Sequence, residues 1–402
     1  MKILVCNTHE TKGGAAKAAR RISQSLCLNG VDNDFLALEG NGIKKTESFF
    51  FRKGKFFWSR LEQYPKIFHS KNFAAPFSVS KHSLGHRKYV EMLNPDLVSL
   101  HYINSGLFSI KDVGLIKKPI VWTLHDSWAF TGGCHLPLEC ERYKESCGSC
   151  PVLNMGKEFD LSRVVWELKK ENWKDLDLTI VSPSKWMGQC ARESSLFKDF
   201  RVEVISNPLD VDVFKKIDRE VAREKLGLDK EKKYILFGAV NAVRDKNKGF
   251  EFLKEAIAQM KIKGVELLVF GSNKKEKVDV DIPVRNLGFV DREEDLAKIY
   301  AAADLTVIPS ISENQPNLAL ESLSCGTPVC GFDIQGLKEV ILDEKLGLLA
   351  KAYKPKDLKD KIEEVLLRET DRDFLSKYVQ TNFNFFKIGK EYKELFEDIL
   401  KN

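Results

Sequence analysis

No run of about 18 apolar residues exists in this 402-residue sequence, so a transmembrane helix is not expected. The apolar run at the N-terminus ends at Cys6, which is too short for a signal peptide and is typical of a first β-strand. Internal repeats, low-complexity segments and a long flexible linker are also missing, which excludes collagenous and wholly disordered proteins. Without an export signal, we expect a cytoplasmic protein whose nine cysteines lie in a reducing compartment.

Positive charge is concentrated in one segment of the chain. The whole sequence has a net charge of +6, whereas residues 44–88 hold eleven Lys or Arg against Glu47 and Glu62, an excess of nine. The remainder is therefore net negative, which argues against nucleic-acid binding. Because the segment is also rich in aromatic side chains, above all from Phe49 to Trp58, it favours contact with an anionic membrane surface. The alternative is that its aromatic residues fill the core and its lysines are solvated.

Short apolar runs alternate with helical patterns along nearly the whole chain. Many runs hold four to six residues without a polar side chain, as strands buried on both faces do. This alternation predicts the α/β class, with parallel sheets and right-handed crossovers. The predicted strands are Ile3–Cys6, Phe35–Leu38, Leu97–His101, Ile120–Leu124, Leu178–Val181, Val202–Ile205, Tyr234–Gly238, Glu266–Phe270, Leu305–Ile308 and Val329–Phe332.

The sequence predicts two α/β domains of about 190 residues each. The first ends near Asn207, because Pro208 stops a strand and a new series of strands begins at Tyr234. We therefore predict an N-terminal domain over residues 1–206. A ligand is expected between two such domains, at the carboxyl ends of the strands.

Two motifs in the first half lie where strands end. Gly13 and Gly14 separate the first strand from the first helix, where they allow the backbone to approach a ligand closely. The N-terminus of the helix that follows favours an anion. The alternative for them is a plain tight turn. His125 ends an apolar strand and precedes Asp126, a place from which it can bind a hydroxyl group or share a proton. The alternative is a structural histidine.

Four of the nine cysteines fall within seventeen residues. The gap of two residues between Cys147 and Cys150 is that of a zinc knuckle, whereas the gap between Cys134 and Cys140 is wider than usual. We predict a structural zinc ion bound by these four cysteines, with His135 as a substitute for one of them. Metal-free thiols and disulfides are the alternatives.

Two motifs in the second half carry charge. Arg244 and Lys248 follow a predicted strand and precede a helix, and two cations beside a helix N-terminus suit a diphosphate. Glu313 and Glu321 flank the start of a helix that has Pro316 in its first turn. Both carboxylates can therefore face one pocket and accept hydrogen bonds from vicinal sugar hydroxyls. A solvated basic loop and a chance spacing are the alternatives.

The motifs of both halves together resemble those of a known family. Glu313-x7-Glu321 with residues 324–329 (SCGTPV) resembles the core signature of family 4 retaining glycosyltransferases of the GT-B fold. Gly13-Gly14, His125 and Lys248-Gly249 occur in the order that this family keeps. Residues 125–151 are similar to the branch that makes bacterial surface polysaccharides such as colanic acid. Residues 378–402 are similar to its last helices, which cross back onto the first domain, so the second domain is expected over residues 207–377.

The resemblance implies two Rossmann-like doubly wound domains that face a cleft, with the acceptor held in the first and a sugar nucleotide in the second. It implies catalytic roles for His125, Glu313 and Lys248, with Lys248 neutralising the leaving diphosphate. Glu321 is expected on the ribose, and the paired glycines at the acceptor and phosphate. The donor-binding residues that it implies are Arg244, Lys248, Gly288, Phe289, Asn314, Asn317, Leu318 and Glu321.

Three positions depart from the family pattern. The usual Arg six residues before Lys248 is Ala242 here, for which Arg244 is the candidate substitute. The usual Ala after the second Glu is Ser322. The usual Gly-Gly-x-Pro-Glu reads QGLKE at residues 335–339, so the loop on the sugar side is expected to differ.

The motifs together with this resemblance imply a retaining glycosyltransferase (EC 2.4) that transfers a sugar from a nucleotide-diphosphate sugar to a glycan or lipid-diphosphate-linked acceptor in polysaccharide biosynthesis. Same-face attack is favoured, because no dedicated nucleophilic carboxylate is evident and the diphosphate can take the acceptor's proton. No cofactor is expected in catalysis. The rival functions are a GT-B sugar-nucleotide epimerase and a sugar-binding protein without turnover. The expected location is the cytoplasm, peripherally at the inner face of the cytoplasmic membrane.

Overall fold

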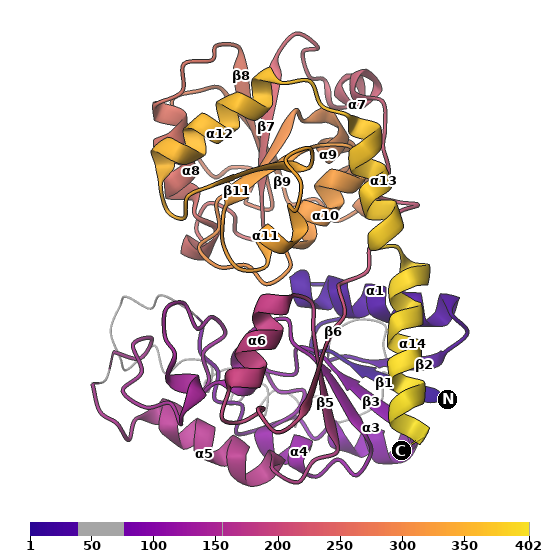
Figure 1. Cartoon of the computed structure of the whole chain (residues 1–402). Helices are drawn as coiled ribbons and strands as arrows, with labels where there is room; N and C mark the ends of the chain where they lie inside the picture. The colour runs from indigo at the N-terminus through magenta and orange to yellow at the C-terminus, as the bar shows by residue number, and fades with distance from the viewer. Residues whose placement is uncertain (39–75, 155, 402) are drawn as a thin grey trace. The chain divides into compact units, whose positions relative to one another are not determined.

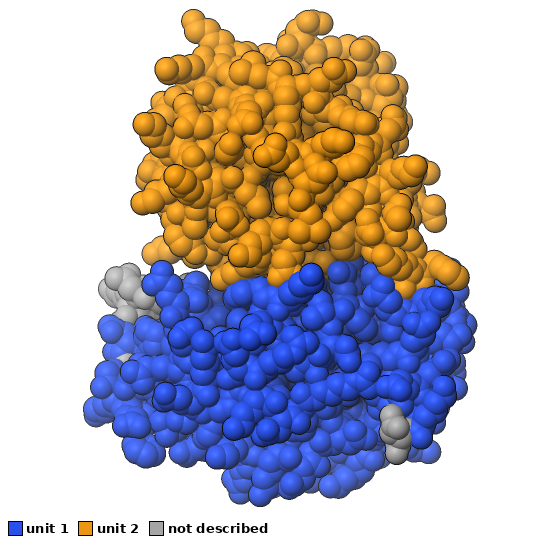
Figure 2. All heavy atoms as spheres, in the orientation of Figure 1, with its two compact units in different colours: residues 1–208, 388–402 blue, residues 209–387 orange. Residues whose placement is uncertain are grey.

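The computed structural model describes residues 1–38, 76–154 and 156–401. These residues form two compact units, unit 1 from residues 1–208 and 388–402, and unit 2 from residues 209–387 (Figure 2). The sequence predicts the first boundary after residue 206 and the second after residue 377. The structure places them after Pro208 and before Ile388. The basic aromatic stretch of residues 49–58 lies outside the described residues.

Unit 1 contains a parallel sheet in the order β2-β1-β3-β4-β5-β6 (Figure 1). Every residue of β3, β4 and β5 is buried, which agrees with the polar-poor runs in the sequence. The strands are β1 (Lys2–Cys6), β2 (Asp32–Leu36), β3 (Leu97–Leu100), β4 (Ile120–Thr123), β5 (Leu178–Ser182) and β6 (Arg201–Val204). The helices are α1 (Gly14–Leu28), α3 (Arg87–Leu93), α4 (Ile110–Gly114), α5 (Leu161–Trp173) and α6 (Lys185–Glu193), with 3₁₀ turns η2 (Trp128–Phe130) and η3 (Arg142–Lys144).

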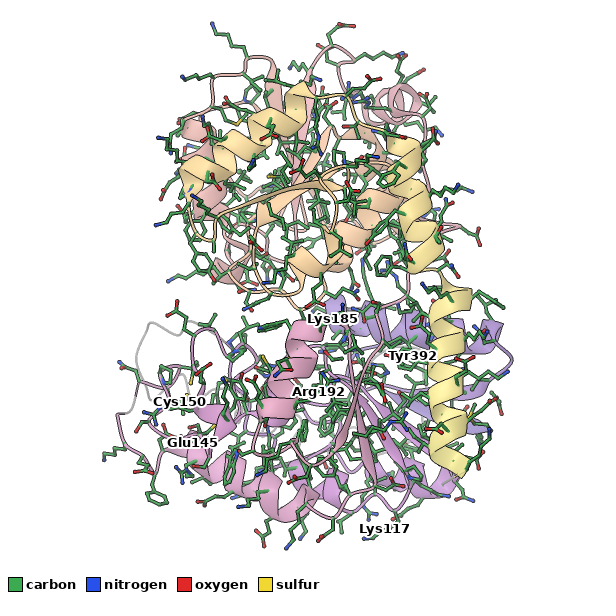
Figure 3. The ribbon with its side chains drawn as sticks, viewed as in Figure 1. Lys117, Glu145, Cys150, Lys185, Arg192 and Tyr392 are labelled. Carbon is green, nitrogen blue, oxygen red and sulfur yellow. The ribbon has the colours of Figure 1, made fainter. Side chains whose placement is uncertain are left out.

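The last helix, α14 (Phe385–Lys401), packs on the sheet of unit 1. Its apolar residues recur at Ile388, Tyr392 and Phe396, which is the spacing of one buried helix face. They share a core cluster with residues of β1, β4 and β5. The hydroxyl of Tyr392, labelled in Figure 3, lies 3.1 Å from Thr123 Oγ1. The prediction that the C-terminal helix returns to the first domain is confirmed.

Unit 2 contains a second parallel sheet, in the order β12-β11-β10-β7-β8-β9 (Figure 1). Its strands are β7 (Lys233–Gly238), β8 (Val265–Phe270), β9 (Val284–Gly288), β10 (Leu305–Ile308), β11 (Val329–Phe332) and β12 (Gly347–Ala350). Its helices are α7 (Arg219–Leu226), α8 (Phe250–Ala258), α9 (Glu293–Ala302), α10 (Asn317–Ser324), α11 (Leu337–Val340), α12 (Pro355–Leu367) and α13 (Arg372–Asn382), with a 3₁₀ turn η4 (Lys246–Lys248).

The parallel arrangement brings the strand ends of each sheet to one edge. In unit 2 the loops after β7, β8, β10 and β11 all leave the sheet at its carboxyl edge. In unit 1 the same holds for the loops after β1, β3 and β4. Most of the candidate residues from the sequence analysis lie in these loops. None of the helices that the structure describes is long and apolar enough to cross a membrane.

Candidate functional site

In unit 2, the loops after the neighbouring strands β7 and β10 are joined by an ion pair. Lys248 Nζ lies 2.7 Å from Glu313 Oε1, and the two side chains are 27% and 14% exposed. Burial lowers the pKa of Lys248, but the charge of Glu313 and its hydrogen bond outweigh burial and raise that pKa above its ordinary value. Lys248 is therefore a cation at neutral pH. The structure brings together two residues that belong to separate motifs in the sequence.

The same two loops are also tied through their backbones. Asn247 donates a side-chain hydrogen bond to the carbonyl of Ser312 (3.1 Å) and accepts one at its own carbonyl from the N–H of Ile311 (2.8 Å). Gly249 has a φ of +68°, and a Cβ there would lie 1.8 Å from the carbonyl oxygen of Pro309. Only glycine fits at so close an approach, which explains why a glycine follows Lys248.

Gln335, in the loop after β11, holds the backbone of Glu313. Its side-chain oxygen accepts hydrogen bonds from Ser312 Oγ (2.6 Å) and from the N–H of Glu313 (2.9 Å). The N–H of Gly336 donates to the carbonyl of Glu313 at 3.1 Å. A Cβ on Gly336 would lie 1.2 Å from the carbonyl oxygen of Asn314, so the two loops touch at backbone level. The departure of this loop from the family pattern is visible in the sequence, whereas its contact with Glu313 is not.

Glu321 lies in α10 and is 3% exposed. The hydroxyl of Tyr300, in α9, donates a hydrogen bond of 2.8 Å to its Oε2. A buried carboxylate held in this way has a fixed orientation. Asn317 and Leu318 are the first two residues of α10, where the helix dipole favours an anion.

The remaining candidates of unit 2 lie at the ends of β7 and β9. The Arg244 side chain is 77% exposed, and its Nε donates to Glu276 Oε1, so the guanidinium is paired with a carboxylate of the loop after β8. Gly288 is the last residue of β9, and its carbonyl accepts a hydrogen bond from the N–H of Gly271 (2.8 Å). Phe289 follows and is 58% exposed, which leaves the ring accessible for stacking.

In unit 1, His125 pairs with His101, a residue that none of the sequence motifs includes. Each follows the end of a strand, β4 for His125 and β3 for His101. His101 Nδ1 lies 2.9 Å from His125 Nε2, and the stacked rings are 5.2 Å apart. Burial lowers the pKa of His125 to about 4, and the charge of Asp126 partly opposes this shift. Burial also lowers the pKa of His101 well below its ordinary value. Both rings line a small pocket together with Tyr102 and Asp126, and both are neutral at pH 7.

Asp126 is paired with His135. The Asp126 Oδ2 lies 2.7 Å from His135 Nδ1, and His135 Nε2 lies 2.8 Å from Ser78 Oγ. Burial raises the pKa of Asp126, but His135 and the N–H of Trp128 outweigh it and lower that pKa. Both nitrogens of His135 thus have partners in the structure, and its part as a substitute zinc ligand stays a prediction.

The glycine pair lies at the start of α1. Gly13 has a φ of +94° and caps the helix, and Gly14 is its first residue. The first turn of α1 has no acidic side chain, so the helix dipole presents its positive end to this loop without a neutralising carboxylate in that turn.

The four cysteines of the predicted zinc site line one cavity, with Cys150 labelled in Figure 3. All four are free thiols. Burial raises the pKa of Cys147 to about 12 and raises those of Cys134 and Cys150 as well. Among the described residues, no three His, Cys, Asp or Glu side chains are arranged to hold a metal ion. The zinc site stays a prediction.

Residues 218–382, which lie within unit 2, match the family model described as glycosyl transferases group 1. Unit 2 is therefore similar to the domain of group 1 glycosyltransferases. Lys248, Glu313 and Glu321 all fall within the matched residues.

Curated relatives extend the match to the first unit. The chain is 25% identical over 85% of its length to the putative colanic acid biosynthesis glycosyl transferase WcaC of Escherichia coli K12, of which it covers 85%. It is 34% identical over 182 residues to the D-inositol 3-phosphate glycosyltransferase of Mycolicibacterium smegmatis, which is 42% of this chain and 41% of that protein. The chain thus spans about two fifths of the length of the inositol-phosphate enzymes that it matches.

Solved structures share the whole fold. Sucrose-phosphate synthase from Thermosynechococcus elongatus superposes with a TM-score of 0.70 at 18% identity, covering 100% of this chain and 99% of that one. HepE of Anabaena in complex with UDP-glucose gives a TM-score of 0.65 at 18% identity over 99% of this chain and 100% of that one. WaaG, a glycosyltransferase of lipopolysaccharide biosynthesis, gives a TM-score of 0.63 at 14% identity, covering 98% of this chain and 99% of that one. The predicted GT-B fold is confirmed.

Proposed function

We propose that this protein is a family 4 retaining glycosyltransferase that transfers a sugar from a nucleotide-diphosphate sugar to a glycan or lipid-linked acceptor. The observation that carries the proposal is the Lys248–Glu313 pair, which lies at the carboxyl edge of the sheet, within the residues that match the group 1 glycosyltransferase model. A cation and a carboxylate fixed side by side suit a donor that carries both a diphosphate and sugar hydroxyls.

The donor is proposed to bind unit 2. Lys248 supplies positive charge to the diphosphate, aided by the dipole of α10, and Glu313 accepts from the donor sugar. Glu321, held by Tyr300, accepts from the ribose hydroxyls. The complexes of HepE with UDP and with UDP-glucose support a nucleotide-sugar donor for a chain of this fold.

The proposed chemistry is attack of the acceptor on the same face that the diphosphate leaves. The charge that grows on the diphosphate is the main demand on the protein, and Lys248 is placed to stabilise it. The departing diphosphate takes the acceptor's proton. His125 is a weak base, because burial lowers its pKa to about 4, so we assign it to positioning rather than to proton removal.

The acceptor is proposed to be a lipid-diphosphate-linked glycan at an anionic membrane surface. The support is the similarity to WcaC and the excess of nine positive charges over residues 44–88. Binding to vesicles is expected to rise with the fraction of anionic lipid and to fall with added salt. Replacing Lys53, Lys55 and Arg60 by Glu is expected to lower it. Binding that does not change with lipid charge, salt or these substitutions contradicts the membrane proposal.

The donor is identified by a thermal-shift screen of sugar nucleotides, because a ligand at 100 times its Kd adds about 2.7 kcal/mol of stability. The product made with that donor is then examined by NMR. A glycosidic bond with the anomeric configuration of the donor supports retention. An inverted bond contradicts it, and conversion of the sugar nucleotide without an acceptor indicates an epimerase instead.

A further inference from the structure

Ser99, His101 and His125 form a line of three polar groups in unit 1. Ser99 and His101 are two residues apart and therefore project from the same face of the sheet. Ser99 Oγ lies 3.3 Å from His101 Nε2, and His101 Nδ1 lies 2.9 Å from His125 Nε2. Both ring nitrogens of the buried His101 are thus occupied. Within the part of the chain that the structure describes, the line ends at Nδ1 of His125, whose ring lines the small pocket.

Each of the two rings carries one N–H hydrogen. A contact of 2.9 Å between two ring nitrogens needs one donor and one unprotonated acceptor, so the pair holds at most one positive charge. Burial lowers the pKa of both rings, and Asp126 beside His125 opposes that shift without reversing it. The other titratable groups that face this site are Tyr102, whose pKa burial raises to about 12, and His135, which is paired with Asp126.

With one hydrogen on each ring, the line has two arrangements. In the first, the hydroxyl of Ser99 donates to His101 Nε2, His101 Nδ1 donates to His125 Nε2, and the hydrogen of His125 is on Nδ1. In the second, every bond is reversed, and the hydroxyl of Ser99 needs a further acceptor. Ser99 is 0% exposed and makes no second side-chain hydrogen bond to the described residues. The second arrangement leaves a buried O–H without an acceptor, which is unfavourable.

We propose that Ser99 and His101 fix the hydrogen of His125 on Nδ1, so that His125 donates a hydrogen bond to an oxygen of the bound ligand. That the ligand is a sugar nucleotide or its acceptor rests on the proposed function, whereas the position of the hydrogen does not. His101 is then a positioning residue, which acts through His125. A neutral donor at this place recognises a hydroxyl or phosphate oxygen and takes no proton from it.

The position of the hydrogen is measured directly by long-range proton–nitrogen NMR on protein labelled with ¹⁵N-histidine, because protonated and unprotonated ring nitrogens resonate far apart. Signals are assigned with the variants His101→Gln and His125→Gln. At pH 7.5 the protein without ligand is expected to show both rings protonated at Nδ1. His125 protonated at Nε2 would overturn the proposal, and this result is independent of whether the protein transfers sugar.

Removal of the serine hydroxyl tests its part in the line. Ser99→Ala is expected to shift His125 towards the form protonated at Nε2, whereas Ser25→Ala is expected to leave it unchanged. Ser25 is the matched control because it is equally buried and bonds to Ile22 in α1. With an established donor and acceptor, Ser99→Ala is also expected to lower kcat/KM severalfold. An unshifted hydrogen contradicts the role of Ser99, and a shifted hydrogen with unchanged kcat/KM contradicts the positioning role.

Discussion

The amine of Lys248 lies 2.7 Å from the carboxylate of Glu313, although the two residues are 65 positions apart in the chain. The two loops meet because β7 and β10 are neighbours in the sheet and because Gly249 allows close approach to Pro309. The pair holds a cation and an acceptor side by side in fixed positions. Such preorganisation is what charge stabilisation in a transfer reaction requires.

Lys248→Met is expected to lower kcat/KM for sugar transfer about tenfold to a hundredfold, because a hydrogen bond to a charged group is worth roughly 1.5–3 kcal/mol. The measurement is steady-state kinetics with the identified donor. Lys246→Met is the matched control, since Lys246 is an exposed lysine of the same turn η4. Equal activity of the two variants contradicts the role of Lys248.

The two glutamates are expected to fail in different ways. Glu321→Ala is expected to weaken binding of the free nucleotide diphosphate about tenfold to a hundredfold, because the ribose loses its acceptor. Glu313→Ala is expected to lower kcat more than it weakens nucleotide binding. Calorimetric titration and kinetics separate these effects. Wild-type behaviour in either variant contradicts the assignment of that residue.

Gln335→Gly is expected to lower kcat severalfold while the melting temperature changes little. The substitution removes the acceptor of the Glu313 N–H, but glycine adopts the φ of +37° at this position without strain. Asn241→Gly is the matched control, because Asn241 also has a positive φ, of 57°, and is exposed. If kcat is unchanged in Gln335→Gly, the side chain does not position Glu313.

Stability is expected to fall as the pH drops from about 6.5 towards 4. The folded protein keeps His125 neutral with a pKa of about 4, whereas an unfolded chain binds that proton near its ordinary pKa of about 6.5. The unfolded state therefore binds more protons in this window, at a cost to folding of at most about 3 kcal/mol. Denaturant unfolding at several pH values measures the slope, which His125→Gln is expected to reduce. An unchanged slope in that variant contradicts the buried neutral state.

The cysteine cavity is expected to hold about one zinc ion per chain in the purified protein. Metal analysis is the measurement, with Cys330→Ser as a control for loss of a buried cysteine elsewhere. Cys147→Ser and Cys150→Ser are expected to lower the zinc content and the melting temperature. Purified wild-type protein without zinc, with four titratable thiols in residues 134–150, contradicts the zinc site.

The sequence was a good guide to the sheets, because buried parallel strands are continuous apolar runs. Each of the ten predicted strands overlaps a strand of the structure. The strand β9 was not predicted, because Arg285 and Asn286 interrupt its apolar run. The strand β12 was not predicted either, because it is four residues long and begins at Gly347. Both lie at the edges of the sheet of unit 2, where burial is less complete and the pattern weaker.

The contacts within the site were harder to predict than its location. Strand ends marked His125, Lys248 and Glu313, and the same rule applied to the run LVSLH was enough to find His101. The hydrogen bond that Gln335 accepts from the N–H of Glu313 could not be predicted in this way. It depends on the conformation of a loop and on a backbone contact at Gly336. Spacing along the chain predicts which loops share an edge, but the pairing of side chains across loops is a tertiary property.

The most direct test of sugar transfer is the release of nucleotide diphosphate from the donor found in the thermal-shift screen, measured with and without the acceptor. We expect release that depends on the acceptor, proceeds in wild-type protein and falls about tenfold to a hundredfold in Lys248→Met. Release at the same rate without acceptor, or no release with any donor that binds, would contradict the claim that this protein is a glycosyltransferase built around Lys248 and Glu313.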